Sequence, residues 1–189
     1  NIPPMRTSIE NYLEQIVRIL PFINETQKFV FISSTSVYQN INSEVFEDLK
    51  VVPEKASGQA ILKVEQKLQD VLKNRVTIIR MSGLVGYNRQ PGRFLANKKE
   101  LKNAEGPVNI IHRDDCIGLI QAVITQNVWG EIINGCADKH PTRKEYYTLG
   151  AKKLGLTPPE FIEEEETTSY KIVSNIKSKT LLKYSYKSP

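Results

Sequence analysis

The chain reads FVFISSTSVY over residues 29–38, and this stretch indicates the class of fold. Its first half, which begins next to Lys28, is an apolar run rich in β-branched and aromatic residues. A short apolar run of this kind indicates a strand buried on both faces, as in a parallel sheet. Small hydroxyl residues follow at its carboxyl end, which is the edge where open α/β sheets bind ligands. The stretch therefore predicts a parallel α/β sheet with a functional edge at residues 33–36.

Helices and strands alternate around this strand. Thr7 or Ser8 can cap a helix that runs to residue 20, and a second helix opens at Pro53 or Glu54 and runs to Lys73. Residues 40–52 between them have no clear period and are interpreted as a loop. Residues 75–81 form a second buried strand. This alternation predicts a doubly wound sheet joined by crossover helices.

Beyond Gly86 the pattern is looser and predicts a small α+β lobe. The expected elements are a short helix or turn at 92–101, a strand at 108–111, a helix from Asp114 or Asp115 to 126, a strand at 131–134, a helix capped by Thr142 that runs to 154, strands near Phe161 and Ile172, and a small helix at 177–182. Some of these strands are expected to complete the main sheet.

Composition narrows the class of protein. The chain has 189 residues and a net charge of +5, but its basic residues are scattered, so we expect no nucleic-acid partner. No apolar stretch approaches the roughly 20 residues of a membrane span, and no secretory signal is visible, so we expect a cytoplasmic protein without a membrane partner. Cys116 and Cys136 lack metal-ligand spacing; we predict free thiols rather than a disulfide, and no metal site.

Two groups of polar residues have side chains of the kinds that bind ligands or take part in catalysis. A hydroxyl at the carboxyl end of the first strand can donate to a substrate carbonyl, although hydroxyl-rich turns are also common without function. Lys63, on the following helix, can hydrogen-bond the ribose of a nicotinamide nucleotide, or it is an ordinary solvated lysine. Residue 59, one helical turn earlier on the same face, is a glutamine, which cannot act as a general acid or base at neutral pH.

The sequence His112-Arg113-Asp114-Asp115 allows a metal-binding, a catalytic or a structural interpretation. We favour the structural one, with Asp114 or Asp115 as the N-cap of the next helix. The predicted role of His112 is a contact on the substrate side and nothing further.

Several motifs in order resemble the extended short-chain dehydrogenases/reductases, the NAD(P)-dependent epimerases and dehydratases of sugar nucleotides. The resemblance covers nearly the whole chain and is carried by FISSTSVY at 31–38, KVEQ at 63–66, IIRMSGLVG at 78–86 and VNIIHRDD at 108–115. The segments PGRFL at 91–95 and HPTRKEYY at 140–147 look like an atypical branch of that superfamily.

The resemblance implies roles for particular residues. The implied catalytic positions are Ser34, Lys63 and Gln59; the implied cofactor contacts are Ile2, Pro3, Ser33, Lys63, Met81 and Ser82; and the implied substrate contacts are Thr35, Ser36, Gly83, Arg93 and His112. It also implies two regions. Residues 1–87 would form the carboxyl half of a Rossmann-like NAD(P)-binding domain, and residues 88–189 a mixed substrate lobe interleaved with the last strands of the sheet.

The sequence departs from the family pattern at three points. Gln59 stands where the family has its catalytic tyrosine, and Gly83 stands where many epimerases have an asparagine. No glycine-rich cofactor-binding motif occurs, and Ile2-Pro3-Pro4 resembles the end of the fourth strand of the family. We therefore expect a fragment that lacks the first strands, leaves the strand at residues 28–33 with an open edge, and binds no dinucleotide tightly by itself.

Three functions are compatible with these sequence features. The first is part of an NAD- or NADP-binding enzyme for a sugar nucleotide or related small metabolite, with a degenerate active site. The second is a non-catalytic dinucleotide sensor or scaffold, and the third a free-standing interaction domain. Expected partners besides the small-molecule substrate are a second copy or a complementing N-terminal half.

Overall fold

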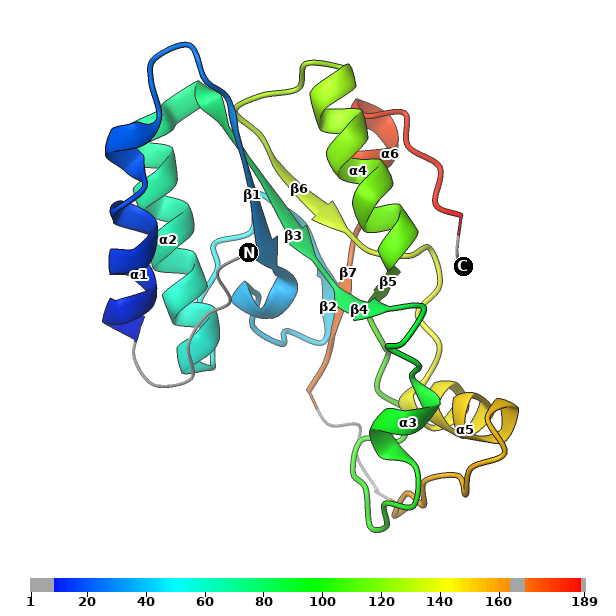
Figure 1. Ribbon diagram of the computed structural model, residues 1–189. Helices are drawn as coiled ribbons and strands as arrows, with labels where there is room; N and C mark the ends of the chain where they lie inside the picture. The colour runs from blue at the N-terminus through cyan, green and yellow to red at the C-terminus, as the bar shows by residue number, and fades with distance from the viewer. Residues whose placement is uncertain (1–8, 164–168, 188–189) are drawn as a thin grey trace.

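The computed structural model describes residues 9–163 and 169–187. Its main sheet has three parallel strands in the order β1-β3-β6, formed by β1 (Phe29–Ser34), β3 (Val76–Met81) and β6 (Ile132–Gly135). Every residue of the central strand β3 is buried, because strands flank it on both sides and helices cover both faces (Figure 1). The short β-rich apolar runs of the sequence thus form a parallel sheet, as predicted.

Helices lie on both faces of this sheet. Helices α1 (Ile9–Val17) and α2 (Ala56–Leu72) pack side by side on one face, and α4 (Arg113–Thr125) covers the other (Figure 1). Successive residues of β3 point to opposite faces. Accordingly Ile78 joins the core beneath α1 and α2, whereas Ile79 joins the core beneath α4. The predicted α/β architecture with a parallel sheet between helices is confirmed.

The remaining elements extend this body at one end. Two small parallel pairs, β2 (Ser43–Val45) with β7 (Lys171–Val173) and β4 (Gly83–Val85) with β5 (Ile110–His112), lead to a lobe formed by α3 (Gly92–Leu95) and α5 (Arg143–Lys153). Helix α6 (Ile176–Leu181) returns to the main body near β6. Short 3-10 turns lie at Leu20–Phe22, Thr35–Val37 (η2) and Lys73–Arg75.

The short strands are where the sequence predictions were least accurate. Residues 40–52 were expected to be a loop, but they contain β2, whose partner β7 pairs Lys171 with Ser43. Gly83–Val85 forms β4, a short strand that the sequence pattern did not predict. The strand expected near Phe161 is only a single bridge to Leu101. Each of these pairings is fixed by a partner far along the chain, so local propensity carried little information about it.

The N-cap of α4 corrects another prediction. Neither Asp114 nor Asp115 caps the helix: His112 does, with extended backbone, and its Nδ1 accepts the Asp114 N–H at 3.2 Å. Both aspartates lie inside the first turn. Asp115 is fully buried and accepts the Tyr184 hydroxyl at 3.0 Å and the Lys187 N–H at 2.9 Å, so it ties the end of the chain to α4.

Helix α5 begins as the sequence predicted. Thr142 is its N-cap and accepts the Glu145 N–H at 3.2 Å, while the Glu145 carboxylate accepts the Thr142 N–H at 3.1 Å. This reciprocal pair is a capping box, which satisfies two backbone donors that the helix leaves without a partner.

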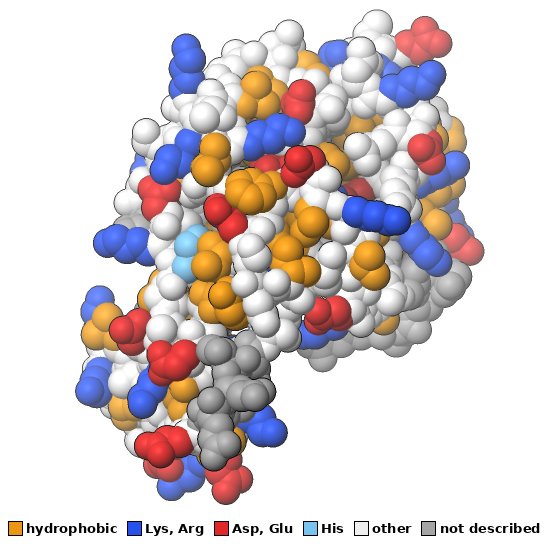
Figure 2. All heavy atoms as spheres, turned by 180° about the vertical axis from the view of Figure 1, so that it is seen from behind, with side chains coloured by type: hydrophobic (Ala, Val, Ile, Leu, Met, Phe, Trp, Pro, Cys, Tyr) orange, Lys and Arg blue, Asp and Glu red, His pale blue; other side chains and the backbone are white. Residues whose placement is uncertain are grey.

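The surface carries charged side chains of both signs. Basic and acidic side chains are mixed over both the main body and the lobe on the face seen in Figure 2. No helix among the described residues is long and apolar enough to cross a membrane.

Cys116 and Cys136 are free thiols, and burial raises the pKa of each to about 11. Within residues 9–163 and 169–187, no group of three or more potential metal ligands gathers.

Candidate functional site

The carboxyl ends of β1 and β3 bring three of the predicted site residues to one edge. The register pairs Ser34 with Met81, so the ends of both strands lie side by side, and Ser82 follows directly. Met81 and Ser82 are buried, whereas Ser34 is half-buried. This is the edge at which parallel sheets place their ligand-binding loops.

The hydroxyl of Ser34 organises the turn that follows β1. Its Oγ accepts the N–H of Ser36 at 3.1 Å and so caps η2. Thr35 is buried within that turn, and Ser36 is half-buried. A serine hydroxyl has one donor hydrogen besides its acceptor lone pairs. The Ser34 hydroxyl can therefore hold the turn and still donate a hydrogen bond to a ligand.

Helix α2 begins against this turn. Gly58, in its first turn, is buried, and a Cβ there would lie 2.5 Å from the carbonyl oxygen of Ser36. Only glycine allows this close approach. Gln59 and Lys63 are exposed and lie one turn apart on α2. The Gln59 amide donates to the Pro53 carbonyl at 3.3 Å, and Lys63 forms no ion pair within the described part of the chain.

A small polar pocket of 200 Å³ opens beside this turn. It is lined by Ser36, Tyr38, Asn40, Glu54, Lys55 and Lys171. Lys171 comes from β7, and its Nζ donates to the Tyr38 carbonyl at 2.6 Å. Burial lowers the pKa of Lys171, and the negative charge of Glu54 acts in the opposite direction. The pocket thus gathers the amines of Lys55 and Lys171 beside Ser36 at the same edge, and no sequence pattern predicted Lys171 there.

Directly beneath this edge lies a buried ion pair. Arg80 on β3 and Glu65 on α2 are 3% and 1% exposed, and Nη2 of Arg80 lies 2.7 Å from Oε2 of Glu65. Nε of Arg80 also donates to both carboxylate oxygens, at 3.1 and 3.3 Å. The hydroxyl of Ser33 donates to the same carboxylate. A buried charge is stable only when paired and hydrogen-bonded in this way.

The network continues across the sheet to β6. Nη1 of Arg80 donates to the Tyr38 hydroxyl at 2.9 Å, and that hydroxyl donates to the Asn134 side chain at 2.8 Å. The guanidinium also lies 4.9 Å from the centre of the Tyr38 ring. The backbone N–H of Asn134 in turn donates to Glu47 at 2.7 Å. Burial raises the pKa of Glu47. The network ties β1, α2, β3 and β6 together below the candidate site.

Sequence reasoning missed this network, although a signal was present. Arg80 lies within the buried run of β3, and Glu65 lies four residues after Ile61 on the inner face of α2. A single charged residue at each of two buried positions indicates that the two form a pair. The network also bears on Ser33: because its hydroxyl hydrogen is donated to Glu65, the Ser33 side chain can meet a cofactor only as an acceptor.

The other predicted site residues are spread more widely. Gly83 is exposed in β4, where a Cβ would lie 3.1 Å from the Asn109 carbonyl oxygen. Arg93 is exposed in the lobe, and its Nε donates to Gln90 at 2.9 Å. His112 serves as the cap of α4 described above. Their contacts with a substrate stay predictions, and Ile2 and Pro3 lie outside the described residues.

The chain is similar in sequence to a curated protein and in structure to NAD-bound epimerases and dehydratases. Protein YeeZ of Escherichia coli K12 is 33% identical over 182 residues, which cover 95% of this chain and 66% of YeeZ. No family model matches the sequence. Among solved structures, UDP-glucuronic acid 4-epimerase from Bacillus cereus, in complex with UDP-glucuronic acid and NAD, superposes with a TM-score of 0.75 at 22% identity, over 96% of this chain and 62% of that one. The dTDP-glucose 4,6-dehydratase from Bacillus anthracis, in complex with NAD, gives 0.77 at 15% identity, over 95% and 63%.

The fold is that of the NAD-dependent epimerases and dehydratases. The resemblance of the sequence motifs to that superfamily therefore agrees with the structure at the level of the fold. The chain spans slightly less than two thirds of the length of these proteins.

Proposed function

We propose that this chain supplies the substrate side and half of the cofactor cleft of an NAD- or NADP-binding protein that acts on a sugar nucleotide or a related small metabolite. One observation carries the proposal. Ser34 and Met81 share a register at the carboxyl ends of two parallel strands, next to the first turns of α2 with Lys63. The cofactor, when bound, supplies hydride exchange with a substrate carbon.

The residues of this chain take distinct roles in the proposal. Ser34 donates its free hydroxyl hydrogen to a substrate oxygen, while its lone pair continues to hold the turn through Ser36. The exposed Lys63 binds the ribose of the dinucleotide. Lys55 and Lys171 offer amines to an anionic group of the substrate, since both line the pocket beside Ser36. Gln59 can hydrogen-bond a substrate but cannot transfer a proton.

The proposal includes a second part of the protein. Within residues 9–163 and 169–187, strand β1 pairs only with β3, and Ile32 on β1 is 47% exposed. An open edge with an apolar side chain favours a further strand at this position. We propose that a cofactor-binding portion adds to this edge, and that the present chain alone binds a dinucleotide weakly.

Gln59 favours a second candidate, a non-catalytic dinucleotide-binding sensor or scaffold. Both candidates require binding, so the first experiment is calorimetric titration of the full-length protein with NAD and NADP. Lys63→Met should weaken the preferred cofactor about tenfold or more through the lost charged hydrogen bond. The matched variant Lys67→Met, one turn further from the strand ends, should leave affinity unchanged. Absence of binding by both dinucleotides contradicts both candidates.

Turnover then separates the two. The full-length protein is incubated with a panel of nucleotide sugars, and products are resolved by chromatography. The enzyme proposal expects turnover that Ser34→Ala abolishes and that Ser57→Ala, on the exposed first turn of α2, does not. Tight cofactor binding without turnover of any sugar supports the sensor instead.

A further inference from the structure

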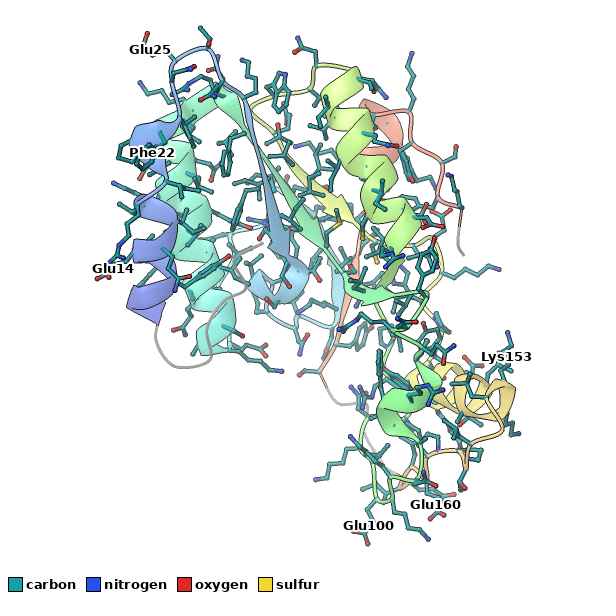
Figure 3. All side chains as sticks on the ribbon, in the orientation of Figure 1. Glu14, Phe22, Glu25, Glu100, Lys153 and Glu160 are labelled. Carbon is teal, nitrogen blue, oxygen red and sulfur yellow. The ribbon has the colours of Figure 1, made fainter. Side chains whose placement is uncertain are left out.

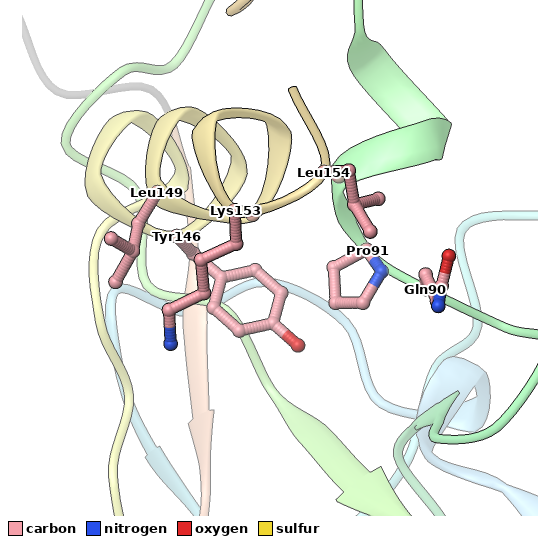
Figure 4. A pocket seen from close by; sticks show the side chains of 8 residues that line it. Gln90, Pro91, Tyr146, Leu149, Lys153 and Leu154 are labelled. Atoms are coloured by element: carbon pink, nitrogen blue, oxygen red, sulfur yellow. The ribbon is translucent and has the colours of Figure 1, made fainter. Parts of the chain in front are cut away.

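A second hollow lies in the lobe, away from the edge at Ser34. Helices α3 and α5 touch through their backbones at Gly92 and Gly150: a Cβ on Gly92 would lie 2.1 Å from the carbonyl oxygen of Gly150. Only glycine permits this contact. Beside this contact, side chains of the two elements line a cavity of 290 Å³ (Figure 4). The cavity is thus a consequence of how the two elements are held together.

Apolar side chains form most of its wall. Pro91 lies on the α3 side, and Leu149 and Leu154 come from α5 and the residue that ends it. Leu149 is 55% exposed, although it is a large hydrophobic side chain. The volume lies just below the 300–1,000 Å³ typical of small-molecule sites. The space therefore suits the apolar body of a metabolite-sized molecule.

Two polar groups of α5 reach the same side of the cavity. Tyr146 and Lys153 project from the helix in the same direction, with the Tyr146 hydroxyl and the Lys153 ammonium at their tips (Figure 4). Lys153 extends outward from the lobe in Figure 3. Over residues 9–163 and 169–187, neither tip has a hydrogen-bond or ion-pair partner.

Tyr146 is held so that its hydroxyl is available. Its ring packs edge-on against Tyr147, with 5.4 Å between the ring centres, and joins the small core beneath the lobe. Burial raises the pKa of Tyr146 to about 12, so the hydroxyl is a neutral donor at physiological pH. Gln90 lies at the rim of the cavity. Its side-chain carbonyl oxygen accepts from Nε of Arg93 at 2.9 Å, which leaves the amide hydrogens of Gln90 as the donors for a ligand.

The polar groups thus include one cation and two further donors around an apolar wall. We propose that this cavity is a binding site for a small monocarboxylate with an apolar body, separate from the proposed cofactor and substrate edge. The carboxylate accepts from the Lys153 ammonium and the Tyr146 hydroxyl, and the body packs on Pro91, Leu149 and Leu154. A single cation beside apolar walls suits a monoanion better than a multiply charged, strongly hydrated phosphate.

The test uses phenylacetate as the probe, with phenylacetamide and phenethylamine as neutral and cationic counterparts of nearly the same shape. Binding is followed by NMR through the methyl signals of leucine residues 149 and 154, which line the cavity. We expect phenylacetate to bind in the millimolar range, the amide about tenfold more weakly, and the amine not at all.

Variants locate the site. Lys153→Met keeps the aliphatic stem and should weaken phenylacetate about tenfold, and Tyr146→Phe should weaken it severalfold. Lys152→Met is the matched control, because Lys152 lines a neighbouring hollow on α5 and not this cavity. Equal binding of all three probes, equal loss in the Lys152 and Lys153 variants, or no shift of the two leucine methyl signals with phenylacetate overturns the proposal. Unfolding curves of each variant verify that the lobe is intact.

Discussion

Breaking the Glu65–Arg80 pair from one side should destabilise the protein far more than removing both charges. In Arg80→Met the Glu65 carboxylate, 1% exposed, keeps only the Ser33 hydroxyl among the partners described above. Leaving one charge of a buried pair without its partner costs about 3–5 kcal/mol. Glu65→Leu leaves the Arg80 guanidinium with the Tyr38 hydroxyl and should cost a similar amount. Either loss is a large part of the about 5–15 kcal/mol of a typical domain.

The double variant Glu65→Leu/Arg80→Met removes both charges. The Ser33 hydroxyl then lacks its acceptor, which costs about 1–3 kcal/mol, while the Tyr38 hydroxyl still donates to Asn134. The sum of the two single variants is about 6–10 kcal/mol, so the double variant should recover several kcal/mol. A coupling free energy of this size shows that removing one charge destabilises the protein far more than replacing both charges with apolar side chains.

The free energy of unfolding is measured in urea, with the fluorescence of the single tryptophan, Trp129, as the signal. Glu65→Gln provides a milder member of the series if a single variant does not fold. The control is Arg18→Met, because Arg18 and Glu14 form an exposed pair at 3.9 Å (Glu14 is labelled in Figure 3). That variant should cost less than about 0.5 kcal/mol. A double variant as destabilised as the sum of its singles would show that the two charges are not coupled.

Three further outcomes follow from local geometry. Because burial raises the pKa of Glu47 above its ordinary 4.5, folding favours the protonated form, and stability declines as the pH rises from the unfolded pKa through the folded one. Glu47→Gln should remove this decline, as seen by comparing urea unfolding near pH 4 and near pH 7. Gly58→Ala forces a Cβ against the Ser36 carbonyl and should cost about 1–3 kcal/mol despite better helix propensity, whereas Ser57→Ala on the exposed neighbouring position should cost nothing in thermal unfolding. In Gly92→Ala the new Cβ would lie 2.1 Å from the α5 backbone, so the variant should abolish phenylacetate binding and loosen the packing of the lobe. Faster hydrogen exchange of the α5 amides would report this loosening. Unchanged exchange would contradict the close contact.

The fold was predictable because its signals are local. The buried runs of β1 and β3 and the helical periodicity of α1 and α2 lie within windows of ten to twenty residues, and the Thr142 capping box lies within four. Such patterns report which faces must be buried, and two layers of helices on a parallel sheet bury them.

The site was only partly predictable for the same reason. The position of Ser34 follows from the end of a strand, but the ring of groups around it comes from elements far apart in sequence: Arg80 from β3, Asn134 from β6 and Lys171 from β7. The N-cap of α4 was predicted wrongly even though all the candidate residues lie close together in sequence. His112, Asp114 and Asp115 each have a side chain that can accept a backbone N–H, and the backbone geometry makes His112 the cap.

The α/β class, the main strands and helices, and the edge at which Ser34 lies could be predicted from the amino-acid sequence, because hydrophobic periodicity and capping act over a few residues. Three features follow from packing instead: Glu65 and Arg80 share one buried network, Lys171 reaches the pocket beside Ser36, and Gly92 meets Gly150 beside the cavity in the lobe. These contacts depend on the distance between chain segments after packing, a quantity that no local pattern encodes.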